Sequence, residues 1–179
     1  MQNIIQGAHF IENGFKSHAK FIDDASYGMI LDNIVFACVD IVLLNEAREM
    51  LLGKRVALPY PDWWIIGGRM LPGENFEESA ARLLKRELDL TMPTARFQYL
   101  CAYSLVWAKR AQPPKKNGSH NIAITMIAKI SDEEKEGIEI KPKEYRSLRW
   151  VNLDEITNGN FHPALIMLAK NTKALLTNL

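Results

Sequence analysis

The sequence has little cysteine, no long uninterrupted apolar run and no excess of charge of either sign. Its two cysteines, Cys38 and Cys101, each lie inside an apolar stretch, which favours two buried free thiols over a disulfide scaffold or a cysteine-bound metal. The longest apolar run, 34–44, is broken by Asp40 and is too short to cross a bilayer. The formal net charge of +1 provides no overall field for nucleic acid or an anionic membrane. Any bound anion must therefore be held by local positive groups.

The first thirty residues do not read as a secretion signal, because charged residues interrupt every apolar stretch. With two cysteines that we expect to be reduced, this predicts a cytoplasmic protein. We expect residues 1–30 to be an N-terminal extension that packs on the domain or on a dimer partner, and residues 31–179 to form one domain. Apolar side chains in the extension predict a short amphipathic helix; they are Phe10, Ile11, Phe15 and Phe21.

The pattern of apolar and turn-forming residues predicts an α+β fold. Asn75 and Glu78 have the spacing of a helix capping box, and they start a predicted helix over 75–88. The other predicted elements are a β-hairpin over 33–55, strands at 63–66, 97–107, 122–130 and 148–151, a short helical turn at 154–155 and a helix at 163–176. This order indicates α+β or an α/β/α sandwich and does not fit a regular βαβ repeat.

One motif points to chemistry. The sequence reads G-R-M-L-P-G-E from Gly68 to Glu74 and, after seven more residues, R-L-L-K-R-E-L-D-L from Arg82 to Leu90. A glycine loop, a carboxylate and a helix carrying an Arg/Glu pair suggest a site for a metal-bound diphosphate. The stretch resembles the Nudix box, G-x5-E-x7-R-E-U-x-E-E-x-G-U, in which U is a bulky aliphatic residue. Departures from the box occur at three positions; they are Leu83, Arg86 and Asp89. The resemblance implies a Nudix-type α/β/α sandwich with a mixed β-sheet.

The helix pattern places Glu87 on the apolar face, among the predicted core residues. A lone buried carboxylate costs several kcal/mol unless it is paired or binds a cation. A helix end that projects Glu87 into water is the alternative interpretation. As a ligand, Glu87 together with Gly68 suits one Mg²⁺, with Mn²⁺ as a substitute, because Mg²⁺ takes most of its remaining ligands from substrate phosphates and water. Leu83 and Arg86 remove the carboxylates that would hold further metal ions.

Three arginines are candidates for binding the diphosphate. Arg55 ends a predicted strand, Arg69 follows the Gly67-Gly68 pair, and Arg82 belongs to the motif itself. A guanidinium grips phosphate oxygens bidentately. The alternative for any of them is a solvated side chain, and Arg82 has a structural alternative in pairing with Glu74 or Glu78.

The departures from the box resemble the GDP-mannose mannosyl hydrolase branch of the Nudix superfamily. That resemblance covers roughly 33–156 and implies attack of water on the anomeric carbon of the sugar. It implies catalytic roles for His120 as base, for Asp40 and for Arg55. Without it, His120 is a loop histidine and Asp40 a polar residue at a strand edge. The rings of Tyr103 and Trp107 are candidates for stacking on a base or sugar, and a place in the core is the alternative for both.

Three functions follow as hypotheses. The first is a Mg²⁺-dependent hydrolase of a nucleotide sugar, GDP-mannose-like, acting as a homodimer. The second is a Nudix pyrophosphatase that attacks phosphorus in another nucleoside diphosphate derivative. The third is a non-catalytic Nudix-fold module that binds a nucleotide or a protein. The expected partner is a small nucleotide sugar, with no nucleic acid and no membrane.

Overall fold

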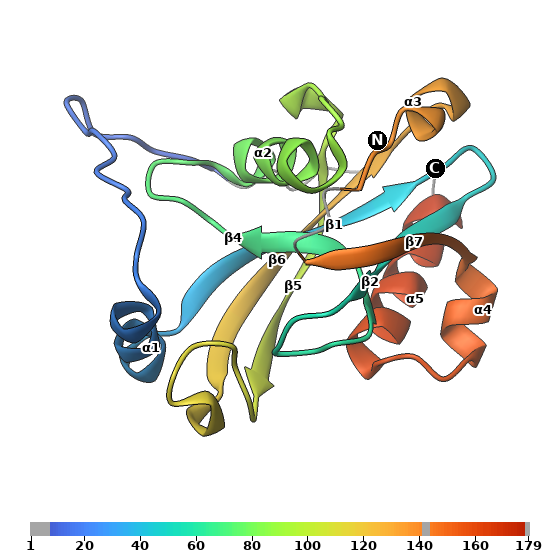
Figure 1. Cartoon of the computed structure of the whole chain (residues 1–179). Helices are drawn as coiled ribbons and strands as arrows, with labels where there is room; N and C mark the ends of the chain where they lie inside the picture. The colour runs from blue at the N-terminus through green and yellow to red at the C-terminus, as the bar shows by residue number, and fades with distance from the viewer. Residues whose placement is uncertain (1–7, 141–143, 178–179) are drawn as a thin grey trace.

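Strand β1 (Phe36–Leu44) lies at the centre of the fold. Within residues 8–140 and 144–177, which the computed structural model describes, seven strands form one mixed sheet (Figure 1). β1 runs parallel to β6 (Ser119–Lys129) and antiparallel to β2 (Glu49–Arg55) and β4 (Ile66–Arg69). The remaining strands extend the sheet on both sides; β3 (Trp63–Trp64) and β7 (Tyr145–Asn152) pair with β2, and β5 (Gln98–Trp107) pairs with β6.

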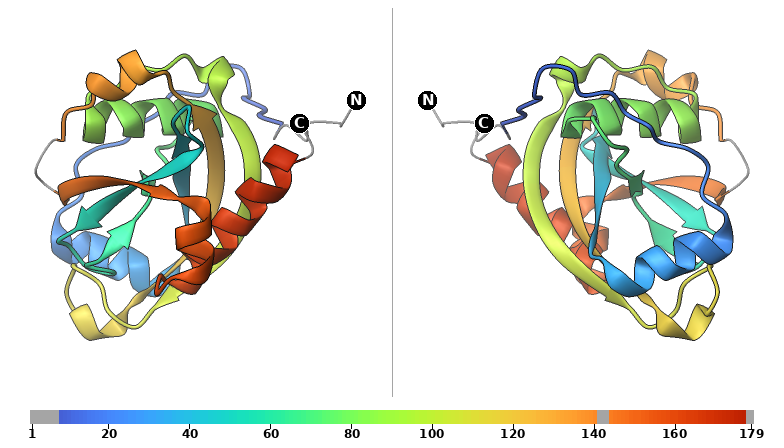
Figure 2. Two further views of the ribbon diagram at one scale, coloured as in Figure 1. Left: turned by 90° about the vertical axis from the view of Figure 1, so that its right-hand side faces the viewer. Right: turned by 90° about the vertical axis from the view of Figure 1, so that its left-hand side faces the viewer.

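Helices pack on both faces of this sheet (Figure 2). Helix α2 (Phe76–Leu88) covers one face, where it packs on alternate β1 residues such as Val39 and Ile41. Helix α5 (Pro163–Thr177) covers the other face with Val42 and Leu44. The shorter helices lie at the margins; they are α1 (Asp24–Asn33), α3 (Asp132–Glu136), α4 (Leu153–Asn158) and the 3-10 turns η1 (Thr94–Arg96) and η2 (Lys115–Asn117). The predicted α+β sandwich with a mixed sheet is confirmed.

Both ends of α2 follow from its sequence. The side chain of Asn75 accepts a hydrogen bond from the Glu78 N–H, and Glu78 reciprocates with the Asn75 N–H, so the predicted capping box is present. The helix ends at Leu88, and its C-cap, Asp89, has a φ of 53° in the left-handed region. That conformation favours glycine, which explains why the box has glycine at this position. Asp89 also forms an ion pair with Lys85.

Three local predictions were wrong. Residues 10–21 form no helix; the first described helix begins at Asp24, behind an N-cap at Asp23, and Phe10 and Phe21 are 92% and 95% exposed. The predicted strand over 63–66 is two strands, since β3 pairs with β2 whereas β4 pairs with β1. The glycine pair expected in a loop lies inside β4. None of the helices in the described part of the chain has the length and apolar character needed to cross a membrane.

Side chains that share one face of β1 line a cleft. Cys38 and Asp40 lie on the same face of β1 as Val42 and Leu44. The latter two pack in the α5 core, whereas Cys38 and Asp40 line an open cleft beyond it. One face of β1 therefore lines the cleft at Cys38 and Asp40 and belongs to the core at Val42 and Leu44.

Candidate active site

The cleft has a volume of about 430 Å³, within the range of ~300–1,000 Å³ that small-molecule sites occupy. Its walls come from the first half of β1, the end of β2, strand β4, helix α1, the loop 110–112 and the start of β6. Glu144 and Tyr145, at the start of β7, close one side. Segments far apart in the sequence thus meet around Asp40.

Asp40 is the most buried carboxylate of the cleft, with 6% of its surface exposed. The Tyr103 hydroxyl donates a 2.7 Å hydrogen bond to its Oδ2. Burial raises the pKa of Asp40 to about 6, and the Tyr103 hydrogen bond opposes that rise. Gly67 lies directly opposite on β4, and a side chain there would overlap Asp40 Oδ1. Asp40 is therefore a carboxylate that titrates close to neutral pH in a fixed position.

Arg55 forms an ion pair with Glu144 inside the cleft. The two are 89 residues apart, and the pairing of β2 with β7 brings them together. Arg55 Nε is buried and has no hydrogen-bond partner among residues 8–140 and 144–177. A buried donor without a partner fits an anion entering the cleft. Sequence reasoning missed Glu144, which belongs to no motif and is recognised only through strand pairing.

Arg69 lines the cleft beside the glycine pair, and its guanidinium lies 4.9 Å from the centre of the Tyr27 ring. Tyr27 belongs to α1, so a residue of the predicted N-terminal extension holds a site arginine through a cation–π contact. The structure thus brings Arg55, Arg69 and Asp40 together as the sequence predicts, and adds helix α1 to their surroundings.

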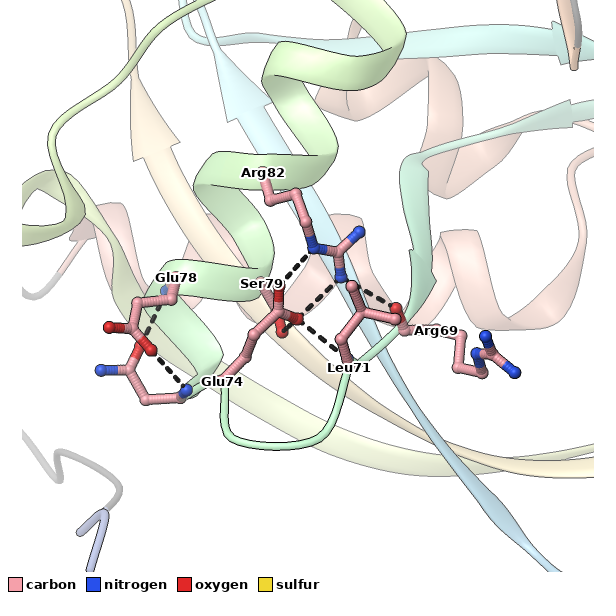
Figure 3. Close-up of polar contacts among 7 residues, drawn as sticks. Arg69, Leu71, Glu74, Glu78, Ser79 and Arg82 are labelled. Carbon is pink, nitrogen blue, oxygen red and sulfur yellow. Dashed lines mark hydrogen bonds and ion pairs between the residues drawn. The ribbon is translucent and has the colours of Figure 1, made fainter. Parts of the chain in front are cut away.

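Arg82 does not line the cleft; it lies on α2 beside the loop that joins β4 to α2 (Figure 3). It binds the Glu74 carboxylate through Nε and Nη2 and donates a 3.0 Å hydrogen bond to the Arg69 carbonyl. Glu74 also accepts from Ser79 Oγ at 2.6 Å and from the Leu71 N–H at 2.9 Å. Burial acts to raise the pKa of Glu74, but these hydrogen bonds outweigh it and lower the pKa to about 2.

This network fixes the loop between β4 and α2 and lies outside the cleft lining, while the Arg69 side chain points away from it. The structural alternative for Arg82, pairing with Glu74, is therefore the arrangement present. An ionised Glu74 and its arginine hold the loop so that the side chain of Arg69 faces the cleft.

Glu87 is buried on the core face of α2, with 5% of its surface exposed. It forms an ion pair with Arg86 Nε, and Arg86 Nη2 lies 3.1 Å from the place a Gly68 Cβ would occupy. Arg86 therefore pairs with one predicted metal ligand, Glu87, and approaches the other, Gly68. Across the described ranges, no three side chains of His, Cys, Asp or Glu are grouped to hold a metal ion. Gly68 lines the cleft whereas Glu87 does not, and the Glu87 carboxylate is paired with Arg86, so a single Mg²⁺ held by these two residues stays a prediction.

The structure does not bring His120 into the cleft. Its neighbours on β6, Ser119 and Asn121, line the cleft, so the alternation of the strand directs His120 to the opposite face. There its Nε2 lies 2.8 Å from Ser104 Oγ. The base expected at His120 must be sought among the side chains that do face the cleft.

An aromatic cluster forms one end of the cleft. Trp64 and Trp107 line it, and Tyr60 and His162 pack behind them. All six pairs of these rings have centroids 5.0–5.7 Å apart. The sequence indicated stacking by Trp107, but not that four rings from three segments meet. Tyr103, the other predicted stacking residue, reaches the site through its hydrogen bond to Asp40.

Comparisons with known proteins agree with this fold. A sequence model of the NUDIX domain matches residues 36–170. The RNA pyrophosphohydrolase of Cereibacter sphaeroides is 26% identical over 127 residues, which cover 66% of this chain and 76% of that protein. Among solved structures, an Ap4A hydrolase from C. elegans has a TM-score of 0.61 at 18% identity and covers 81% of this chain and all of its own. The NUDIX domain of Shewanella oneidensis NrtR, complexed with ADP ribose, has a TM-score of 0.61 at 17% identity, covering 80% and 90% of the two chains.

Proposed function

The chain belongs to the NUDIX domain family, and on that premise we propose that it is a Mg²⁺-dependent hydrolase of a nucleotide sugar. Its products would be a nucleoside diphosphate and the free sugar, with GDP-mannose the first substrate to test. The observation that carries this proposal is the environment of Asp40. A buried carboxylate whose pKa is raised to about 6 faces the same cleft as Arg55 and Arg69.

In the proposed reaction, Asp40 is the general base. Its carboxylate accepts a proton from water while the water oxygen bonds to the anomeric carbon and the bond from that carbon to the phosphate oxygen breaks. A base with a pKa near the working pH combines availability with basicity. Tyr103 holds the carboxylate in place through its hydrogen bond. Asp40 thus takes the role that the family resemblance implied for His120.

The departing diphosphate carries the negative charge of the broken bond. Arg55 and Arg69 neutralise it, and the unpartnered Arg55 Nε is a donor available for this purpose among the described residues. Glu87 and the Gly68 carbonyl would hold Mg²⁺, which would supply further neutralisation of the leaving group. The aromatic cluster offers Trp64 and Trp107 as contacts for the base or the sugar.

A phosphorus-attacking pyrophosphatase is the second candidate, favoured by the RNA pyrophosphohydrolase among the relatives. Attack at phosphorus relies on hydroxide generated by metal ions in a carboxylate cluster. The lack of such a cluster in the described ranges supports attack at carbon instead.

The test is a screen of nucleotide sugars, dinucleotides and nucleoside triphosphates with Mg²⁺ or Mn²⁺, with every product identified. Release of free sugar and nucleoside diphosphate supports the proposal. Release of a sugar phosphate or of nucleoside monophosphate supports the pyrophosphatase and contradicts it. Tight binding without turnover supports the third hypothesis, a binding module.

We further propose that the protein is a cytoplasmic homodimer, with the N-terminal extension packing on the partner. Residues 1–7 lie outside the described residues, but Phe10 and Phe21 present nearly whole phenyl rings to solvent, and a second copy would cover them. Cys38 and Cys101 are unpaired, which supports a reducing compartment. Light scattering should give twice the chain mass, and Phe10→Ser with Phe21→Ser should halve it; a wild-type monomer contradicts the proposal.

A further inference from the structure

The C-terminal turn of α2 has lost the charge that the Nudix box places there. The box has three glutamates in the segment R-E-U-x-E-E, and this chain has Leu83, Arg86 and Glu87 in their places. The formal charge of those three positions changes from −3 to 0. A site with that change is much less able to concentrate divalent cations, and it repels a diphosphate less.

Arg86 stands where its charge reaches the cleft. Its side chain is 48% exposed, its Nε binds the buried Glu87, and the residue lines the same cleft as Arg55 and Arg69. Its Nη2 lies against Gly68, where an added Cβ would be 3.1 Å from this nitrogen and 2.8 Å from Leu83. The glycine therefore leaves the space that the guanidinium fills.

Glu87 holds Arg86 by one edge of the guanidinium. A guanidinium has five N–H donors in a rigid fork, so the bond through Nε leaves the Nη groups to be directed by Gly68 and the cleft. A guanidinium oriented by a carboxylate on one side binds phosphate oxygens on the other. This arrangement differs from a surface ion pair, because its carboxylate is buried and Arg86 Nη2 lies beside Gly68 of β4.

We infer that Arg86 is a resident cation of the diphosphate subsite, in the place where further metal ions would lie, so that a nucleoside diphosphate binds here without a divalent ion. The inference rests on the proposed function, because it assumes that the cleft takes a diphosphate. Glu87 then positions Arg86, and a Mg²⁺ held by Glu87 would share its carboxylate with that guanidinium. Turnover would then require Mg²⁺, whereas binding of a nucleoside diphosphate would not.

Calorimetry with GDP and with inorganic pyrophosphate, in EDTA and in Mg²⁺, tests this. The variants are Arg86→Gln and Arg86→Glu. The matched control is Lys85→Gln, which removes one positive charge from the preceding residue of α2; Lys85 does not line the cleft. Wild type should bind both ligands in EDTA. Arg86→Gln should weaken that binding by about 10- to 100-fold, as expected for a lost charge-assisted pair, and Lys85→Gln by no more than about 3-fold.

Arg86→Glu restores the residue of the box, so its binding should become dependent on Mg²⁺. Wild-type binding that needs Mg²⁺, or equal losses in Arg86→Gln and Lys85→Gln, overturns the inference. Thermal unfolding of Arg86→Gln separates lost binding from lost folding. Turnover of a nucleotide sugar in the same samples separates the two proposals: metal-free binding through Arg86 without turnover leaves the inference standing and rejects the hydrolase.

Discussion

Tyr103 on β5 hydrogen-bonds Asp40 on β1 across the intervening strand β6, with 2.7 Å between the hydroxyl oxygen and Oδ2. The contact joins residues 63 positions apart in the chain. It stabilises the ionised form of a carboxylate whose burial favours the protonated form. The balance of these two effects sets the pH at which the proposed base is active.

Tyr103→Phe should shift that balance. Without the hydroxyl, the pKa of Asp40 rises above about 6, because the hydrogen bond that lowers it is lost. The acidic limb of the pH profile of kcat/KM should move to higher pH, and more activity should be lost at pH 6 than at pH 8. Tyr99→Phe on the same strand is the control, because Tyr99 packs in the opposite core. An equal loss at all pH values contradicts the assigned role.

Asp40→Asn should raise stability while it removes activity. The folded pKa of about 6 lies above the ordinary value of 3.8, so as the pH rises through this window the unfolded chain loses its proton first. The free energy of unfolding then falls by on the order of 3 kcal/mol, a cost that persists at neutral pH. Asparagine avoids this cost, so the melting temperature should increase at pH 7.5 and change little below pH 4.

The same variant should lower kcat by about 10²- to 10⁴-fold, as expected for loss of a general base. His120→Gln is its matched control: His120 faces away from the cleft, so its turnover should stay within about 2-fold of wild type. A large loss in His120→Gln together with a small one in Asp40→Asn would return the role of base to the histidine.

Gly67→Ala should disturb the site directly, because the added methyl group would overlap Asp40 Oδ1 and approach the Val39 carbonyl within 2.8 Å. We expect a loss of about 1–3 kcal/mol in stability and at least a tenfold loss in kcat/KM. Gly137→Ala is the control, since its added atom would meet only ordinary contacts at 3.6 Å and beyond. Unfolding curves and steady-state kinetics on both variants test this prediction. Equal losses of stability and kcat/KM in the two variants would contradict close packing around Gly67.

Arg110 joins helix α1 to the loop that forms one wall of the cleft. It is fully buried, forms an ion pair with Asp32 at 2.7 Å, and donates to the carbonyls of Gly118 and Pro113. Arg110→Met should cost about 1–3 kcal/mol, because the carbonyls of Gly118 and Pro113 lose their donor, and it should raise KM because the loop lines the cleft. Lys109→Met, at an exposed position, should change neither quantity. Unchanged stability in Arg110→Met would contradict this anchoring role.

The elements that local sequence dictates were predicted closely. The capping box at Asn75 fixed the start of α2, and the apolar period fixed its core face with Glu87 in it. Strand order was not accessible in this way, because the pairing of β2 with β7 depends on contacts distant in the chain. For that reason the partnership of Arg55 with Glu144 was missed.

His120 shows a second limit of the sequence. A shift of one residue in a strand reverses the face of a side chain, so proximity to a predicted loop does not tell whether a histidine enters the cleft. The apolar residues between positions 10 and 21 show a third limit: their spacing predicts a helix, but the segment forms none and Phe10 and Phe21 are exposed.

The position of the new oxygen atom tests the central claim most directly. A nucleotide sugar that the protein hydrolyses is incubated with it in ¹⁸O-water. The heavy oxygen should appear in the free sugar and not in the nucleoside diphosphate, because Asp40 directs water to the anomeric carbon. Heavy oxygen in a phosphate product would show that phosphorus is attacked and would contradict the account.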